Sequence, residues 1–177
     1  MKKLMKENKA LIGVIIFGII FTIFIVTWII ISISSREYKK RYLFNMEDYK
    51  INISSTPIQN DNRETYYTTS FEFVTENTGK KEVRTYFVDF DGIYKDKLPK
   101  DVKEVTINKK TFKYTQEQSD YDADLYYQIP KTHEYILIGV SGGSVYVNGE
   151  QIKMLAPVDE KLLNSKELAD VLDFDIK

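Results

Sequence analysis

Two short stretches of the chain hold residue types whose spacing could do chemistry. Asp89 and Asp91 end an apolar run in YFVDFDGIYKD and offer a pair of carboxylates for acid–base work. Ser141 lies in GVSGG and offers a hydroxyl nucleophile. Neither chemistry operates unless the surrounding elements place a second catalytic group beside it. The question for both stretches is therefore what kind of structure surrounds them.

The carboxylate stretch resembles the nucleophile loop of haloacid dehalogenase-like phosphatases. In that family the first aspartate attacks phosphorus, the second acts as acid and base, and Mg²⁺ bridges them, so the resemblance implies these roles for Asp89 and Asp91. That loop must leave a parallel strand and enter a helix, whereas here a hairpin partner precedes it and Pro99 follows too soon. The pattern instead predicts a strand that ends in an Asp91-Gly92 turn, with Asp89 facing solvent.

GVSGG matches Gly-x-Ser-x-Gly and looks like the nucleophile loop of serine hydrolases. A nucleophile elbow runs from strand through serine to helix, but Ser141 is followed by another strand pattern. The only histidine, His133, lies eight residues earlier, at the far end of the same predicted strand. A serine–lysine pair is the remaining option for Ser141, and we expect the glycines to form a hairpin turn.

Three alternating aspartates follow in SDYDADLYY and resemble the first half of a calcium loop. They are Asp120, Asp122 and Asp124. An EF-hand loop also needs glycine at its sixth position and glutamate at its twelfth, where this chain has Leu125 and Lys131. We expect an exposed acidic loop, with a weak Ca²⁺ site completed by distant oxygens as the alternative.

Residues 10–35, ALIGVIIFGIIFTIFIVTWIIISISS, contain no charged side chain. At about 1.5 Å of rise per residue, a helix of this length exceeds the roughly 30 Å hydrocarbon core of a bilayer. We therefore predict a transmembrane helix over residues 10–35, with a cytoplasmic head over 1–9 and a basic juxtamembrane linker over 36–47. A cleaved signal peptide is the alternative, but its best cleavage site, Ser32-Ile33-Ser34, is weak.

Charge and composition favour a location but no ligand. Basic residues flank both ends of the apolar run, so the tendency of Lys and Arg to stay in the cytoplasm does not set its orientation. The short N-terminal head instead favours a cytoplasmic N-terminus and an extracytoplasmic C-terminal domain. The many Lys, Ile, Asn and Tyr residues and the absence of cysteine resemble a Gram-positive bacterial cell-envelope protein. A mildly acidic domain is a poor nucleic-acid binder, and without cysteine it has neither a disulfide nor a thiolate site.

Residues 48–177 are dominated by alternation, which is typical of β-strands. Residues 63–91 predict a hairpin around ENTGKK, residues 102–114 a second one around NKK, and residues 134–154 a three-stranded meander. The last twenty residues predict an amphipathic helix with Ser165 as an internal N-cap. The fold class is therefore α+β: a membrane helix, then a mostly antiparallel sandwich or partly open barrel of about six to eight strands, then a short C-terminal helix.

The tyrosines suggest where such a domain could bind. We expect a contact surface among Tyr66, Tyr67, Tyr126, Tyr127 and Tyr146, because tyrosine stacks on sugars and is enriched at protein interfaces. The sequence thus predicts a non-enzymatic, single-pass binding or assembly protein that needs no cofactor. Its partner would be another membrane protein or a cell-wall glycan. The alternative is a tethered hydrolase that uses Asp89 and Asp91, or Ser141 with a lysine.

Overall fold

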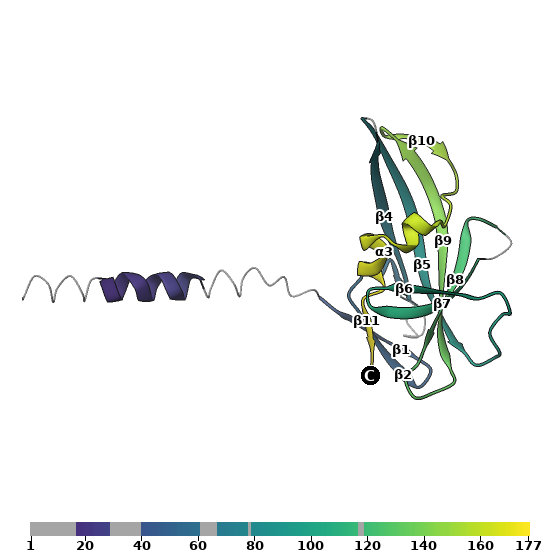
Figure 1. Ribbon diagram of the computed structural model, residues 1–177, viewed down its shortest axis with the longest axis horizontal. Helices are drawn as coiled ribbons and strands as arrows, with labels where there is room; N and C mark the ends of the chain where they lie inside the picture. The colour runs from purple at the N-terminus through teal and green to yellow at the C-terminus, as the bar shows by residue number, and fades with distance from the viewer. Residues whose placement is uncertain (1–16, 29–39, 61–66, 78, 117–118) are drawn as a thin grey trace, which may run out of the picture. The chain divides into compact units, whose positions relative to one another are not determined.

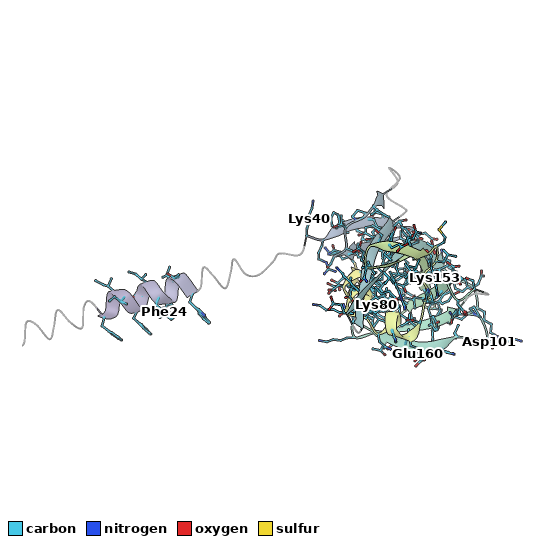
Figure 2. The ribbon with its side chains drawn as sticks, turned by 90° about the horizontal axis from the view of Figure 1, so that it is seen from above. Phe24, Lys40, Lys80, Asp101, Lys153 and Glu160 are labelled. Atoms are coloured by element: carbon cyan, nitrogen blue, oxygen red, sulfur yellow. The ribbon has the colours of Figure 1, made fainter. Side chains whose placement is uncertain are left out.

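The computed structural model describes residues 17–28, 40–60, 67–77, 79–116 and 119–177. The chain divides into two units, residues 1–39 and residues 40–177. In the first unit residues 17–28 form an α-helix, and side chains such as Phe24 project outward from it (Figure 2). Among the described residues, none of the helices combines the length and the apolar character that crossing a bilayer requires. The predicted span over residues 10–35 extends beyond the described residues at both ends.

The second unit is β-rich, and its main element is an eight-stranded antiparallel sheet (Figure 1). Seven strands follow the order β3-β4-β5-β9-β8-β7-β6, and β10 pairs with the end of β9 beyond β8. The bounds are β3 Gln59–Asn60, β4 Tyr67–Asn77, β5 Lys80–Tyr94, β6 Lys103–Ile107, β7 Lys110–Gln116, β8 Asp122–Gln128, β9 Tyr135–Val147 and β10 Glu150–Lys153. The predicted hairpins at β4–β5 and β6–β7 are confirmed.

A second sheet of three strands joins the two ends of this unit. Its order is β1-β2-β11, where β1 is Tyr42–Met46, β2 is Tyr49–Ile53 and β11 is Phe174–Ile176. Both outer strands run antiparallel to β2, and Tyr42 and Phe174 lie opposite the same residue, Ile53. The folded unit therefore begins before residue 48, because residues placed in the predicted linker form β1.

The core lies between the two sheets and is rich in aromatic rings. Phe44 and Phe174 of the small sheet meet Phe90 of the large sheet at ring-centroid distances of 5.6 and 5.5 Å. Tyr86, Val88 and Phe90 alternate along β5 with no exposed surface, as predicted. Because side chains of a strand alternate between faces, their neighbours in β5 lie on the outer face of the large sheet, away from the small sheet.

The C-terminal segment contains two short helices where the sequence predicted one. They are α2, Glu160–Leu163, and α3, Lys166–Val171. The predicted internal cap is confirmed, since the Ser165 hydroxyl accepts a hydrogen bond from the Leu168 N–H at 3.2 Å. The chain then continues into β11, which the sequence did not predict. Leu162, Leu168 and Leu172 have no exposed surface, so this segment is part of the core and not only a cover.

Two predicted turns are wrong. Strand β5 continues through Asp91 and Gly92 to Tyr94, with a β-bulge between Phe90 and Gly92. Strand β9 likewise continues through Ser141–Gly143, so GVSGG is strand and not a turn. Both errors have the same cause, because small or polar residues in a strand that pairs on both sides look like loop residues in the sequence.

Candidate functional site

The structure brings the three chemically suggestive stretches together on the outer face of the large sheet. A cleft of about 170 Å³ is bordered by β5, β8 and β9. We call it the acidic cleft; its polar border consists of Asp89, Asp91, Asp122, Asp124, Gly139 and Ser141. These residues are spread over more than fifty positions of the chain, and the pairing of the strands is what makes them neighbours. Asp89 and Asp124 both lie opposite Gly139, on either side of β9.

The bulge in β5 places Asp91 in the cleft. It inserts one residue between the pairs Phe90 with Ile138 and Gly92 with Leu137, so Asp91 has no partner of its own in the register. The Asp91 carboxylate lies across Gly139, where a Cβ atom would come within 2.9 Å of Asp91 Oδ2. Glycine at position 139 thus leaves the space in which this carboxylate sits.

Each of the other carboxylates is held by a nearby hydroxyl group. Thr68 Oγ1 donates to Asp89 Oδ1 at 2.6 Å, Ser119 Oγ donates to Asp122 Oδ2 at 2.7 Å, and the Tyr126 hydroxyl donates to Asp124 Oδ2 at 3.1 Å. These contacts fix the direction of the carboxylates without neutralising them. No lysine, arginine or histidine is among the described residues that border the cleft.

Partial burial and, after it, nearby negative charge perturb one carboxyl group of the cleft, that of Asp91. Partial burial raises the pKa of Asp91 from 3.8 to about 6, and repulsion from Asp89 and then Asp124 adds to this effect. A hydrogen bond from the Gly139 N–H opposes the rise. Asp91 is nonetheless an exposed residue at the rim of the cleft, so water screens part of the repulsion. Asp91 therefore gives up its proton at a higher pH than an ordinary aspartate does.

The arrangement permits some chemistries and lacks the parts for others. A carboxyl group with a raised pKa can transfer protons, and a cleft bordered by four aspartates attracts cations. No group of three or more acidic or histidine side chains among the described residues has the geometry to hold a metal ion. Asp120, the first aspartate of the calcium-like stretch, does not border the cleft. Ser141 borders it, but neither a lysine nor His133 does.

The predicted tyrosine surface is not one surface in the structure. Tyr67 and Tyr126 are 1% and 4% exposed, so neither offers a surface to a partner. Tyr127 packs partly buried against Phe174, and Tyr146 lies half-buried near the other end of β9. Tyr66 lies outside the described residues. The alternation rule could have placed Tyr67 inside, because it shares a parity with the apolar Phe71 and Phe73.

A larger hollow of about 440 Å³ lies by the β4–β5 hairpin, apart from the acidic cleft. Arg84 is one of the residues that line it, and the Arg84 guanidinium binds Glu82 at 2.6 Å and Asp159 at 3.0 Å. Asp159 also caps α2 by accepting a hydrogen bond from the Leu162 N–H. This network joins α2 to the sheet, which gives the arginine a structural role.

Comparison with protein-family models, with curated proteins and with solved structures finds no match in any of the three. The site is therefore interpreted from its own geometry.

Proposed function

We propose that this chain is a non-enzymatic, single-pass membrane protein of a bacterial cell envelope. In this proposal its β-rich unit lies outside the cytoplasm and binds a cationic segment of a partner protein in the acidic cleft. The observation that carries the membrane part is the run of 26 residues, 10–35, without a charged side chain. A run this long suits a bilayer and is unusual elsewhere.

The described part of that run supports lipid exposure. Its only polar side chains are Thr22 and Thr27, and each hydroxyl donates to a carbonyl one turn earlier, Gly18 O and Ile23 O, at 2.8 Å. These internal bonds leave no hydroxyl that needs water, which is the condition for a helix in hydrocarbon. The large apolar side chains of the helix are all exposed, from 39% at Ile25 to 70% at Phe17.

The acidic cleft supports the choice of a cationic partner. Four carboxylates border one shallow concavity, and the groups that contact Asp122 and Asp124 in the structure are neutral hydroxyls. Burial is the main reason that the pKa of Asp91 is raised, and repulsion from Asp89 and Asp124 adds to it; binding Lys or Arg side chains there would reduce that repulsion. Phe87, 38% exposed on the same face, adds apolar contact area.

The binding part is tested by capture of partners from solubilised envelopes onto the full-length protein in mild detergent. The double variant Asp122→Asn/Asp124→Asn removes two charges while it keeps the hydroxyl contacts. It should lose most of the retained protein, and added salt should weaken retention by the wild type. Asp101→Asn/Glu150→Gln removes two exposed charges outside the cleft and is the matched control. Equal retention by both double variants would contradict the proposed site.

The location is tested separately by protease treatment of intact cells. Extracytoplasmic placement predicts that added protease digests the β-rich unit in intact cells. Protection in intact cells, followed by digestion after lysis, would place the unit in the cytoplasm instead.

A tethered hydrolase is the second candidate, and the convergence of Asp89, Asp91 and Asp124 in one cleft favours it. In such an enzyme Asp91, whose pKa burial raises, would donate a proton while a neighbouring carboxylate of the cleft acts as base. Purified protein incubated with cell-wall glycans and ester substrates tests it. Turnover that Asp91→Asn abolishes would support this candidate over simple binding, and absence of turnover would end it.

A further inference from the structure

Strand β4 lies near one margin of the large sheet and is paired along its whole length on one side only (Figure 1). Its eleven residues pair with β5 without a register shift, whereas β3 pairs only with Tyr67 and Thr68. No other described strand pairs with β4. Residues 71–77, roughly 20 Å of extended chain, therefore have an open edge.

The open edge presents a row of backbone donors and acceptors. The Ile58 N–H donates to Thr68 O at 2.9 Å, so the backbone groups of Thr68 point away from β5. Since these groups alternate in direction along a strand, those of Glu72, Val74 and Glu76 point the same way. Outside the pairing of β4 with β5, none of the described residues makes a backbone hydrogen bond to these three. Another extended strand supplies partners at this spacing.

Strand β4 lacks most of the features that normally prevent pairing at the edge of a sheet. It contains no proline, and its pairing with β5 has no bulge. Strand β6, at the other end of the sheet, has only five residues and is a much shorter edge. The charged residues of β4 are Glu72 and Glu76, and both are exposed on the outer face. These two charges decide which strand fits the edge.

The glutamates disfavour a second copy of β4 as the partner. In an antiparallel pair of two such edges, Glu72 would lie opposite Glu72, Val74 or Glu76 of the other copy, depending on the register. With Val74 opposite, the glutamates of the two copies are still diagonal neighbours. Like charges on neighbouring strands destabilise the pair, so the edge is unsuited to self-association.

The same charges favour a strand with basic side chains at alternate positions. Lys81 lies opposite Glu76 on β5, but Thr85 lies opposite Glu72, so Glu72 has no basic side chain across from it. No ion pair within the described part of the chain includes either glutamate. A Lys or Arg residue of an added strand would complete the cross-strand pair with Glu72.

The inner side of the same edge is apolar. Phe71 and Phe73 alternate with the glutamates, are half-buried and pack against the core. Phe71 also stacks on Tyr86 at a ring-centroid distance of 5.6 Å. β-Branched side chains of an added strand would cover the part of these rings that remains exposed, because aromatic and β-branched residues form favourable cross-strand pairs.

We propose that the open edge of β4, residues 71–77, binds an extended basic segment of another protein by strand addition. Basic side chains of this segment alternate with β-branched ones. The basic side chains meet Glu72 on the outer face, and the β-branched ones meet Phe71 and Phe73 on the inner face. The acidic cleft is bordered by β5, β8 and β9, so this surface is separate from it and the inference does not depend on the function proposed above.

The probe is a peptide of alternating lysine and valine, about nine residues long so that it covers the edge. It carries a fluorescent label and is titrated with the full-length protein in nonionic detergent, with anisotropy as the readout. One control peptide has glutamate in place of lysine. Another is methylated at the backbone nitrogens of its lysines, which removes the N–H donors that would face β4. Each titration is repeated with Asp122→Asn/Asp124→Asn, so that binding at the acidic cleft is not counted.

Two variants of the protein test the edge itself. Val74→Pro removes the N–H at the centre of the open edge and keeps the hydrogen bonds to β5, because proline is tolerated where the N–H points away from the sheet. Glu72→Lys reverses the charge that selects the partner. Asp101→Lys reverses an exposed charge outside the strands and is the matched control. Tyrosine circular dichroism reports whether each variant is folded, and the methylated peptide tests the edge on the wild type if Val74→Pro is not.

We expect saturable binding of the lysine peptide, weakened about tenfold by Val74→Pro or by backbone methylation. Glu72→Lys should weaken it several-fold and improve binding of the glutamate peptide, and Asp101→Lys should change neither. Amide hydrogen exchange at Glu72, Val74 and Glu76, followed by NMR, should slow when the peptide binds.

Three results would overturn the inference. The first is no saturable binding, or binding that backbone methylation and Val74→Pro leave unchanged. The second is equal affinity for the lysine and glutamate peptides, or loss of binding in Asp122→Asn/Asp124→Asn, which would assign the peptide to the acidic cleft. The third is a dimer of the wild type that Val74→Pro dissociates, which would assign the edge to a second copy.

Discussion

Asp91→Asn should make the folded unit more stable at neutral pH, because it removes a charge that the fold disfavours. The pKa of Asp91 rises from 3.8 to about 6 on folding. A carboxyl group with a raised pKa contributes stability that is complete below pH 3.8 and is lost as the pH rises through about 6. In the wild type, the ionised Asp91 carboxylate therefore lowers the free energy of unfolding above pH 6, and the protonated group does not lower it below pH 4.

The magnitude follows from the structure after a correction for exposure. A difference between 3.8 and about 6 sets a ceiling of about 3 kcal/mol, since each pKa unit is worth about 1.4 kcal/mol. Asp91 is an exposed residue, and solvent screening reduces the expected effect to about 1 kcal/mol. We expect Asp91→Asn to raise the free energy of unfolding by that amount at pH 7 and to change it little at pH 4.

Urea unfolding of the full-length protein in nonionic detergent measures this effect. Twelve of the thirteen tyrosines lie within residues 40–177, so tyrosine circular dichroism reports mainly the β-rich unit, whereas Trp28 lies in the N-terminal helix. Asp101→Asn, at an exposed position outside the cleft, controls for the loss of one charge. A difference between wild type and Asp91→Asn that is the same at pH 4 and pH 7 would refute the electrostatic reasoning. Destabilisation at pH 7 would refute it as well.

Four further substitutions test the packing, the burial of Tyr67 and the helix cap. Gly142→Ala should destabilise the unit by about 3 kcal/mol in urea unfolding, because its Cβ would lie 1.8 Å from the backbone oxygen of Ala156. Gly139→Ala should cost less than about 1 kcal/mol, because the new Cβ contacts the end of the Asp91 side chain, which can move. Equal losses for the two glycine variants would contradict the view that one Cβ meets rigid backbone and the other a movable side chain. Burial raises the pKa of Tyr67 to about 12, so its contribution to stability is lost as the pH rises from 10 through 12. Tyr67→Phe should resist alkaline unfolding better, followed by circular dichroism, while it loses about 1 kcal/mol at pH 7 with its hydrogen bond to Ser55 O. Ser165→Ala removes the α3 cap and should cost about 1 kcal/mol, and no loss would mean that the cap is replaced.

Local patterns were sufficient for the regular strands. Alternation along β4 and β5 placed Tyr86, Val88 and Phe90 in the core, and all three have no exposed surface. The residues of the Asn148-Gly149 turn have positive φ values of 50° and 87°, as a two-residue hairpin turn requires. These features depend on neighbours in sequence, so periodicity and turn chemistry report them.

Local patterns failed where pairing on both sides overrode them. Asp91-Gly92 and Ser141–Gly143 look like turns, yet β5 and β9 pair along this length and absorb the irregular residues as bulges. The acidic cleft was missed for the same reason. Asp89 and Asp91 on β5 and Asp124 on β8 become neighbours only through β9 between them. One signal in the sequence could have indicated the cleft: β5, β8 and β9 each carry acidic or small polar residues at the positions that face away from the core.

Amino-acid order alone accounts for the uncharged run over residues 10–35, the β-rich character of the rest, and the helix cap at Ser165, because each depends on side chains a few positions apart. Tertiary structure decided that β11 returns to pair with β2, beside the first strand of the unit, and that four aspartates share one concavity. Such contacts join residues tens of positions apart. Their free energy comes from burying Phe44, Phe90 and Phe174 together, which no local window of the sequence contains.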